Sequence, residues 1–455
     1  MGVTEQVAAF SVHTAFEEVP PQAYTTAKHA MLDGLGCALV GSPTPTGKLI
    51  AQYVRDRGGE PRAGVIGCGF KSSSPLAALA NGTMAHALDF DDVNASMTGH
   101  PTAPLLPAVL ALAQEIHASG QAVLLAYTLG FEVQAKLGLG LNPMHYDLGW
   151  HATSTLGTLG AATACAKLLR LDVASTQMAL GIAASTAAGL RQNFGTMTKP
   201  FHPGQAAMNG VTAALLAQVG FTADANILEA PYGFCQLYTG RGPYQLEPIV
   251  KGLGHPYELV ANGVSIKQYP CCAFTHRALD GMLTLVQQHH IAADDVAAVE
   301  CQVGRQALEV LMHARPQTGL EGKFSMPYCM AAALLDRRVG LLSFSDEKVR
   351  RPAAQQLCER VRMALHPEAQ ANGTHGEDLP VNLTVTLKDG RTYSTQVQHP
   401  KGAPANPLSA IQLQEKFEDC AQGVLERRDI QQVIALVRDI EHLDDIGTLV
   451  DILMA

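Results

Sequence analysis

The chain has 455 residues, of which 47% are hydrophobic and 16% are charged, and its formal net charge is −9. This length exceeds what one ordinary core accommodates, so we expect two domains, one of them large. The negative charge argues against nucleic acid and against an anionic membrane surface as partners. The N-terminal residues include acidic side chains, and no stretch reaches the roughly 18–20 apolar residues of a spanning helix, so we expect a cytoplasmic protein with no signal peptide and no membrane segment.

The ten cysteines are dispersed along the chain, and none forms a C-x-x-C pair. Only Cys271 and Cys272 are adjacent, and neighbouring cysteines rarely bridge to each other. No spacing suits a tetrahedral zinc site. We therefore expect free, buried thiols and no metal.

Up to about residue 260 the apolar residues follow the period of a helix. Ser74-Pro75 is typical of an N-cap followed by proline in the first turn, and Leu76, Leu79 and Ala80 begin a 3.6-residue period. Ala and Gly are abundant, so these helices can pack closely. The other expected helices run from Pro107 to a stop near Ser119-Gly120, through Leu124 to Ala135, and over 154–169, 175–190 and 206–219.

The pattern changes near residue 265. Residues 296–303 and 381–387 alternate as strands do, and Asp389-Gly390 supplies a turn into 392–397, which predicts a β-hairpin. Helices are expected at 275–289 and 327–336, and a Pro- and Gly-rich stretch at 399–407 precedes the last helices. The predicted fold is mainly α: a large helical domain made of 1–264 and 398–455, with a smaller α+β lid domain, 265–397, inserted into it.

An acidic cluster follows the helix that starts at Ser74. Asp89, Asp91 and Asp92 crowd its expected C-terminal end, where the helix dipole disfavours anions and the carboxylates repel one another. His86 shares a helix face with Asp89, and His100 follows. Carboxylates that stand in an unfavourable place without visible compensation favour a functional site. The alternative is that the helix ends early and that Asp91 or Asp92 caps the next segment.

His151 stands at the head of a helix of small residues. A helix N-terminus lowers an imidazole pKa and favours bound anions, so His151 is a candidate acid/base group. A purely structural histidine is the alternative.

Two basic segments complete the candidate site. The segment 191–204 carries Arg191, Lys199 and His202 between apolar helices, and the segment 266–277 carries Lys267 and Arg277 where the two domains join. Such cations suit a di- or tricarboxylate ligand. A solvated loop and a simple hinge are the alternatives. No dinucleotide fingerprint, Walker loop or G-x-S-x-G elbow is present, so no cofactor is expected.

Several short segments, in this order and over nearly the whole chain, resemble the MmgE/PrpD family, which includes 2-methylcitrate dehydratases, cis-aconitate decarboxylases and iminodisuccinate epimerases. They are Asp33-Gly34, Gly36-Cys37, 87–92 (ALDFDD), His100-Pro101, 130–133 (GFEV), 199–204 (KPFHPG), 267–271 (KQYPC), 324–328 (FSMPY) and 402–408 (GAPANPL). The resemblance implies a homodimer, an active site between a helical domain and a lid, and no metal or iron–sulfur cluster. The family's active-site positions fall on Asp89, His100, His151, Lys199, Lys267 and Tyr328.

The resemblance also implies the chemistry, which is proton transfer at a carbon next to a carboxylate. Lys199, Lys267 and His100 would hold substrate carboxylates, His151 would act as acid or base with help from Tyr328, and Asp89 would orient His100 or a cation. Further substrate contacts are expected from His202, Arg191, Cys272 and His276.

The sequence leaves dehydration, decarboxylation and epimerisation open. Val93-Asn94 stands where dehydratases and decarboxylases tend to carry Thr-Trp, and Cys272 stands where decarboxylases carry His. An inactive carboxylate-binding paralogue is a further alternative. Asp89-Phe-Asp91-Asp92 also faintly resembles the magnesium motifs of isoprenoid synthases, but an aromatic content of 5% argues against that class.

Overall fold

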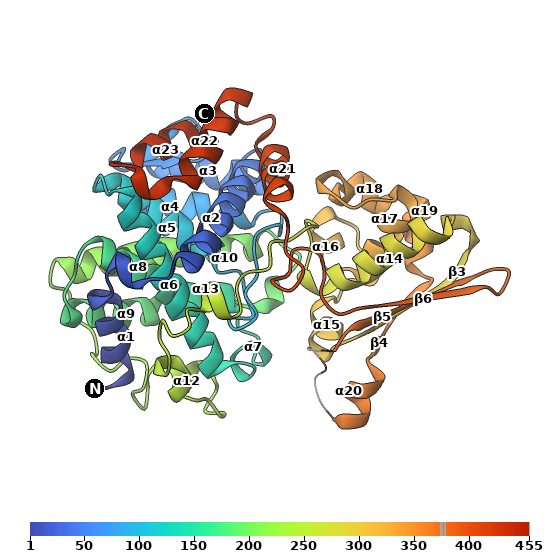
Figure 1. Cartoon of the computed structure of the whole chain (residues 1–455), viewed down its shortest axis with the longest axis horizontal. Coiled ribbons are helices and arrows are strands. Elements are labelled where there is room, and N and C mark those ends of the chain that lie inside the picture. Colours follow the sequence, from blue (N-terminus) through green and yellow to red (C-terminus); the bar gives the residue numbers. More distant parts are fainter. Residues whose placement is uncertain (374–375, 377–378, 455) are drawn as a thin grey trace.

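The computed structural model describes residues 1–373, 376 and 379–454. A large body of helices lies beside a smaller body of helices and strands, and both termini lie on the large body (Figure 1). The chain enters the smaller body after α13 (Glu258–Ala261) and returns before α21 (Ala410–Ala421). The first connecting segment is 265–272 and the second is 398–409. They lie side by side, because Ile266 N–H donates to the Gly402 carbonyl at 2.9 Å.

The large body also contains a short antiparallel pair, β1 (Ala63–Val65) and β2 (Phe70–Ser72). Its helices are α1 (Val3–His13), α2 (Pro21–Gly41), α3 (Pro45–Arg57), α4 (Ser74–His86), α5 (Thr102–Glu115), α6 (Gly120–Leu141), α7 (Met144–Asp147), α8 (Ala152–Leu168), α9 (Val173–Thr186), α10 (Thr198–Gln218), α11 (Phe234–Tyr238), α12 (Glu247–Val250), α13, α21, α22 (Arg427–Arg438) and α23 (Gly447–Leu453).

The central helices α4, α5, α6, α8 and α10 pack through small residues. At the crossing of α4 and α10, a Cβ added to Gly82 would lie 2.8 Å from the Cα atom of Gly204. At the crossing of α6 and α8, a Cβ on Gly130 would lie 2.7 Å from the Gly160 carbonyl oxygen. These glycines let the backbones approach, and the approach of α4 to α10 later sets the geometry of the site.

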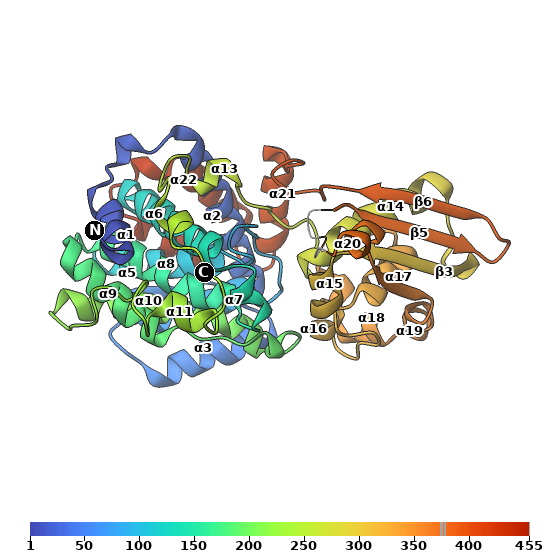
Figure 2. The ribbon, with the colours of Figure 1, turned by 90° about the horizontal axis from the view of Figure 1, so that it is seen from below.

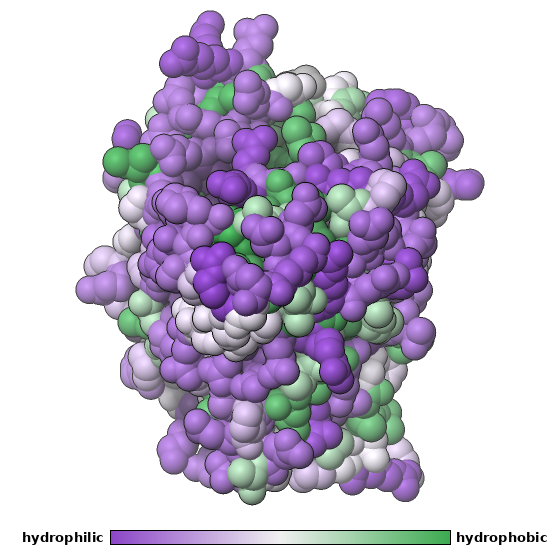
Figure 3. Space-filling model, turned by 90° about the vertical axis from the view of Figure 1, so that its right-hand side faces the viewer, coloured by the Kyte–Doolittle hydropathy of each residue, from purple (hydrophilic) through white to green (hydrophobic). Residues whose placement is uncertain are grey.

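The smaller body is a four-stranded sheet with helices on it, seen from below in Figure 2. The strand order is β4-β3-β5-β6, with β3 parallel to β4 and antiparallel to β5. The elements are α14 (His276–His289), β3 (Val296–Val303), α15 (Arg305–Val310), α16 (Gly319–Gly322), α17 (Met326–Asp336), α18 (Asp346–Arg350), α19 (Pro352–Cys358), β4 (Val361–Leu365), α20 (Pro367–Asn372), β5 (Val381–Leu387) and β6 (Thr392–Val397). Every second residue of β5 is buried, and α14 packs on the sheet at β5 and β6. The outer end of this body is mostly hydrophilic, with small separate apolar patches (Figure 3).

The structure confirms the mainly α fold and the hairpin of β5 and β6, with Gly390 at φ 88° in the turn. It corrects three helix starts. α5 begins at Thr102, so Pro107 lies inside it. Nearly all of α5 is buried, and that packing outweighs the hydrogen bond that proline cannot donate. Ser119 is the N-cap of α6, and α10 begins at Thr198, which places much of the basic segment in its first turns.

Helix α6 is long and apolar enough to cross a membrane by length and composition alone, whereas we expected no stretch of that kind from the sequence. In the structure 83% of its most apolar 18-residue window is buried inside the protein. Its neighbours there are α8 and α5, as for a core helix.

Candidate active site

A cavity of about 420 Å³ lies between the two bodies. Its lining combines residues of the helical body with residues of the first connecting segment and of the smaller body. Seven of the ten site residues predicted from sequence line it: Asp89, His100, His151, Lys199, Lys267, Cys272 and His276. The volume falls within the range of small-molecule sites.

Lys199 reaches the site because of how α4 and α10 cross. The contact of Gly82 with Gly204 brings the C-terminal end of α4 against the N-terminal end of α10. Lys199 lies in the first turn of α10, before Gly204, and its Nζ atom lies 2.7 Å from His86 Nε2. It also lies 3.2 Å from Asp89 Oδ1.

Asp89 is held between two ammonium groups. Lys267 Nζ lies 2.6 Å from Asp89 Oδ1 and 2.9 Å from the Asp89 backbone carbonyl oxygen. Burial would raise the pKa of Asp89, but Lys199 and Lys267 hold that pKa well below its usual range. Burial opposes the charge of Lys267 too, yet Asp89 and then Asp91 raise its pKa above the ordinary value. Both groups are therefore charged at neutral pH.

Asp91 lies close to both His86 and His100, next to the Asp89–Lys267 ion pair. Its carboxylate oxygens lie 2.8 and 2.9 Å from His86 Nδ1, and one of them lies 3.2 Å from His100 Nδ1. Burial lowers the pKa of His86 to about 4, although Asp91 acts in the opposite direction, and burial also lowers the pKa of His100. Both rings are thus neutral at pH 7. Because a carboxylate only accepts hydrogen bonds, the His86 proton sits on Nδ1.

Asp92 does not line the cavity and instead bonds to the start of α5. Helix α4 ends at His86, before the acidic cluster, as the alternative interpretation proposed. Asp92 accepts hydrogen bonds from the backbone N–H and the hydroxyl of Thr102, the first residue of α5, at 3.2 and 2.6 Å. Burial raises the pKa of Asp92 well above its ordinary value.

His151 stands at the N-cap position of α8 and is buried. Its Nδ1 lies 3.0 Å from Nδ1 of His202, so one ring donates to the other. Burial, followed by the charge of Lys199, holds the pKa of His151 well below 6.5, and burial lowers the pKa of His202 to about 4. His151 is therefore a neutral imidazole, able to accept a proton.

Three predicted residues do not line the cavity. His202 lies behind His151. The Tyr328 hydroxyl is fully buried and donates to the Ser343 carbonyl. Arg191 donates from Nη1 to the Tyr146 carbonyl at 2.6 Å and lies over the Tyr146 ring at 4.0 Å. Tyr328 and Arg191 thus lie outside the cavity lining, with the Tyr328 hydroxyl and one Arg191 nitrogen bonded to backbone carbonyls.

Lys323 was not predicted from sequence, although it lies close to the site. Its Nζ atom donates to the carbonyls of Leu88 and Pro270, each at 2.6 Å, and so joins the helical body to the first connecting segment. Burial lowers the pKa of Lys323 to about 8. The position of Lys323 directly before the segment 324–328 (FSMPY) was the available signal.

Four donor groups come within 4.8 Å of one another: those of His86, Asp89, Asp91 and His100. Lys199 and Lys267 place ammonium groups directly on this set. A divalent cation there would face two positive charges at contact distance. The donor set therefore fits lysine counter-ions better than a metal.

The charge of the cavity is positive. Among the described residues of its lining, Asp89 is the only carboxylate, whereas both bodies and both connecting segments supply cations: Lys199, Lys267, Arg277 and Lys401. With Asp89 neutralised by two lysines, this lining suits an anionic ligand with more than one carboxylate.

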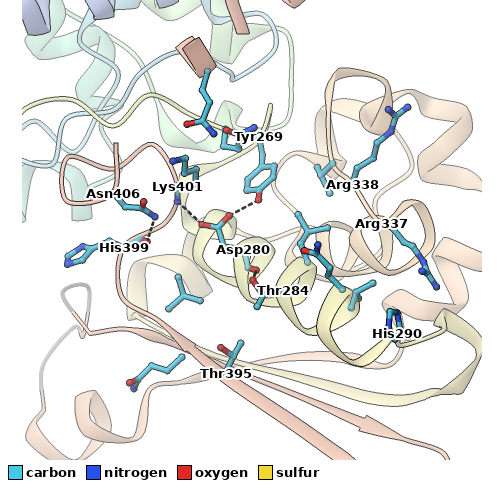
Figure 4. A pocket seen from close by; sticks show the side chains of 18 residues that line it. Tyr269, Asp280, Thr284, His290, Arg337, Arg338, Thr395, His399, Lys401 and Asn406 are labelled. Atoms are coloured by element: carbon cyan, nitrogen blue, oxygen red, sulfur yellow. Dashed lines mark hydrogen bonds between the residues drawn. The ribbon is translucent and has the colours of Figure 1, made fainter. Parts of the chain in front are cut away.

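A second, more open hollow of about 1100 Å³ lies beside the connecting segments on the smaller body (Figure 4). At its centre, Asp280 of α14 accepts hydrogen bonds from the Tyr269 hydroxyl and the Lys401 backbone N–H, both at 2.6 Å. Tyr269 belongs to the first connecting segment and Lys401 to the second. Asp280 thus ties both segments to the smaller body.

Two models of a known protein family match the chain. The model of the MmgE/PrpD N-terminal domain matches residues 5–247, and that of the MmgE/PrpD C-terminal domain matches residues 269–441. The chain belongs to the MmgE/PrpD family. The resemblance seen in the sequence is therefore confirmed, and with it the expectation of an MmgE/PrpD-type enzyme.

Relatives in this family match over nearly the full chain. Cis-aconitate decarboxylase of Mus musculus is 30% identical over 94% of this chain and 88% of its own length. Cis-aconitate decarboxylase of Aspergillus terreus is 28% identical over 99% of this chain and 96% of its own. 2-Methylcitrate dehydratase of Cupriavidus necator is 26% identical over 95% of this chain and 92% of its own.

Proposed function

We propose that this protein is a cofactor-independent lyase that moves a proton at a carbon next to a carboxylate in a small di- or tricarboxylate. The observation that carries the proposal is the pair of buried ammonium groups, Lys199 and Lys267, on one carboxylate at the floor of a cationic cavity with neutral imidazoles. The names of the relatives, a decarboxylase and a dehydratase of tricarboxylic acids, support this substrate class.

Lys199, Lys267 and His100 would bind the substrate carboxylates. As the neighbouring carbon gains electron density, one carboxylate takes up negative charge, and an ammonium group already in place stabilises it without reorganisation. Asp89 keeps the two lysines charged and close together rather than touching carbon.

His151 would exchange the proton. It is neutral, it lines the cavity, and its Nδ1 is engaged by His202, so the other ring nitrogen serves the substrate. In a decarboxylation the bond to the carboxylate breaks, carbon dioxide leaves, and a proton taken up from water and passed on by His151 replaces it on carbon. In a dehydration the base removes the proton and hydroxide leaves from the adjacent carbon.

Epimerisation is the second candidate, since the same site could return the proton to the opposite face. Cys272 lines the cavity, so a thiol that burial keeps protonated is available there, with its pKa raised to about 12. The homodimer expected from the family stays part of the proposal, and light scattering on a sizing column would measure it.

Proton NMR in D₂O distinguishes these outcomes. Separate samples would contain cis-aconitate, 2-methylcitrate, citrate and iminodisuccinate, each with enzyme. Itaconate carrying deuterium indicates decarboxylation, a new alkene signal from a hydroxy acid indicates dehydration, and deuterium at the α-carbon without loss of mass indicates epimerisation. A folded protein that binds these acids and changes none of them would support the inactive paralogue instead.

A further inference from the structure

We infer that His86 and Asp91 form a positioning pair that holds Lys199 by one N–H and leaves another N–H for the substrate. His86 is fully buried and is not part of the cavity lining, so it acts on the substrate only through Lys199. The inference rests on the proposed function, because it assumes that the Lys199 ammonium stabilises charge on a substrate carboxylate.

Asp91 fixes which nitrogen of His86 meets Lys199. Both oxygens of Asp91 lie within 2.9 Å of His86 Nδ1, so the proton of the neutral ring is on Nδ1. Nε2 is then an unprotonated acceptor, and it lies 2.7 Å from Lys199 Nζ. Without Asp91, the ring could present an N–H to the ammonium and repel it.

The remaining surroundings of Lys199 restrict it further. Asp89 Oδ1 forms an ion pair with the ammonium group at 3.2 Å. The rings of Phe194 and Phe324 lie 5.2 and 5.1 Å from Nζ. One N–H is thus bonded to His86, the carboxylate of Asp89 draws the ammonium from a second side, and the aromatic rings flank it, which leaves an N–H for a substrate oxygen. An ammonium held in this way is preorganised for an oxyanion.

Several titratable groups act on Lys199 from the elements packed around it. Burial lowers its pKa most, Asp89 raises it, Lys267 lowers it, and Asp91 and Cys272 raise it. His86, His100 and His151 also surround the site, and burial lowers the pKa of each. Loss of the His86 acceptor would remove one hydrogen bond from the charged form, so the pKa of Lys199 would fall further.

A buried imidazole could instead serve only as filling. The two roles differ in what a matched substitution does. Leu fills the volume of His86 without an acceptor, whereas Gln can place an amide oxygen near the position of Nε2. His145 supplies the control, because it is fully buried, bonds to Thr155 at 2.9 Å and lies outside the cavity lining.

The test compares H86L, H86Q and H145L in the full-length enzyme. For H86L we expect kcat to fall about 10- to 100-fold with KM changed less than about threefold, because the lost interaction matters most when charge develops. The basic limb of the kcat–pH profile should move to lower pH in H86L. H86Q should restore both kcat and the limb to near wild type, and H145L should leave both unchanged.

A second measurement separates this inference from the proposed function. Binding of tricarballylate, an unreactive tricarboxylate, is followed by calorimetry between pH 6 and 10. Affinity should begin to fall at a lower pH in H86L than in wild type and H86Q. If wild type converts no substrate but shows this pattern, the proposed function fails while the role of His86 stands.

Two results would overturn the inference: H86L with the wild-type kcat and basic limb, or H86Q as impaired as H86L. If thermal melting shows that H86L does not fold, Asp91→Asn takes its place, because it keeps the volume and removes the charge that fixes the tautomer. A wild-type pH profile in Asp91→Asn would equally overturn it.

Discussion

Lys267 holds Asp89 at two points, through the side-chain carboxylate at 2.6 Å and through the backbone carbonyl at 2.9 Å. Asp89 has φ 52°, a left-handed conformation that few non-glycine residues adopt. The lysine therefore fixes both the charge balance of the site and the turn that follows α4.

Replacing Lys267 by methionine should destabilise the protein, because it leaves a buried carboxylate with one cation fewer. Breaking a buried ion pair from one side costs about 3–5 kcal/mol. Activity should fall by at least about 100-fold, since a carboxylate-binding group is lost as well. Urea unfolding and steady-state kinetics measure the two effects.

The double variant K267M/D89N serves as the control. Removing the stranded charge should recover much of the free energy of unfolding but none of the activity. If K267M alone were as stable as wild type, the account of Asp89 as a charged, two-lysine centre would be wrong.

Substituting Gly204 by alanine should harm the site from a distance. Its added Cβ would lie 2.3 Å from the Leu79 carbonyl oxygen and from Thr83 Oγ1, so α4 and α10 must separate. Overpacking of this kind costs about 1–3 kcal/mol. Because the same crossing brings Lys199 to His86, kcat should fall together with stability.

Gly340 provides the comparison, since a Cβ there meets nothing within 4 Å. G340A should leave the melting temperature and kcat close to wild type. A G204A enzyme with full kcat would show that the helix crossing does not set the position of Lys199.

These relationships show where sequence reasoning stopped. The alternation in β5 and the Asp389-Gly390 turn predicted a hairpin, because strand pairing there is local. The motifs also pointed to Asp89, Lys199 and Lys267. What they could not give was the direction of side chains, which depends on contacts between residues far apart in the chain. Tyr328 faces Ser343 instead of the cavity for that reason, and the lone Lys323 meets its partners only after folding.

The Lys323 contacts should hold the two bodies together across a wide pH range. With its pKa near 8, the neutral amine that forms above that pH still has two N–H groups for the carbonyls of Leu88 and Pro270. In the unfolded chain the lysine pKa is about 10.4, so the unfolded state binds more protons between pH 8 and 10. Wild-type stability should therefore rise relative to K323M as the pH rises through this interval.

Urea unfolding of wild type and K323M at pH 7 and pH 9.5 measures this difference. If the free energies of unfolding of wild type and K323M differed less at pH 9.5 than at pH 7, the placement of a buried, readily deprotonated lysine between the two bodies would be contradicted.

Asp280 should control how firmly the connecting segments are held. In D280A the Tyr269 hydroxyl and the Lys401 N–H lose their shared acceptor, which costs about 1 kcal/mol for each of these partly buried bonds. Limited proteolysis should then cut within 265–272 or 398–409 faster than in wild type. Q287A, an exposed change on the same helix, should be cut at the wild-type rate. If D280A were also cut at the wild-type rate, Asp280 would not be what holds the two connecting segments.

The proposed chemistry is proton transfer at carbon by lysine and histidine side chains without a metal. The most direct test measures turnover of cis-aconitate, 2-methylcitrate, citrate and iminodisuccinate by proton NMR in D₂O. One sample contains enzyme treated exhaustively with EDTA, and the other contains the same enzyme after addition of Mg²⁺. We expect at least one acid to be converted at the same rate in both samples, and we expect His151→Ala to abolish that conversion while remaining folded. Conversion only after Mg²⁺ addition, or full turnover by His151→Ala, would contradict it.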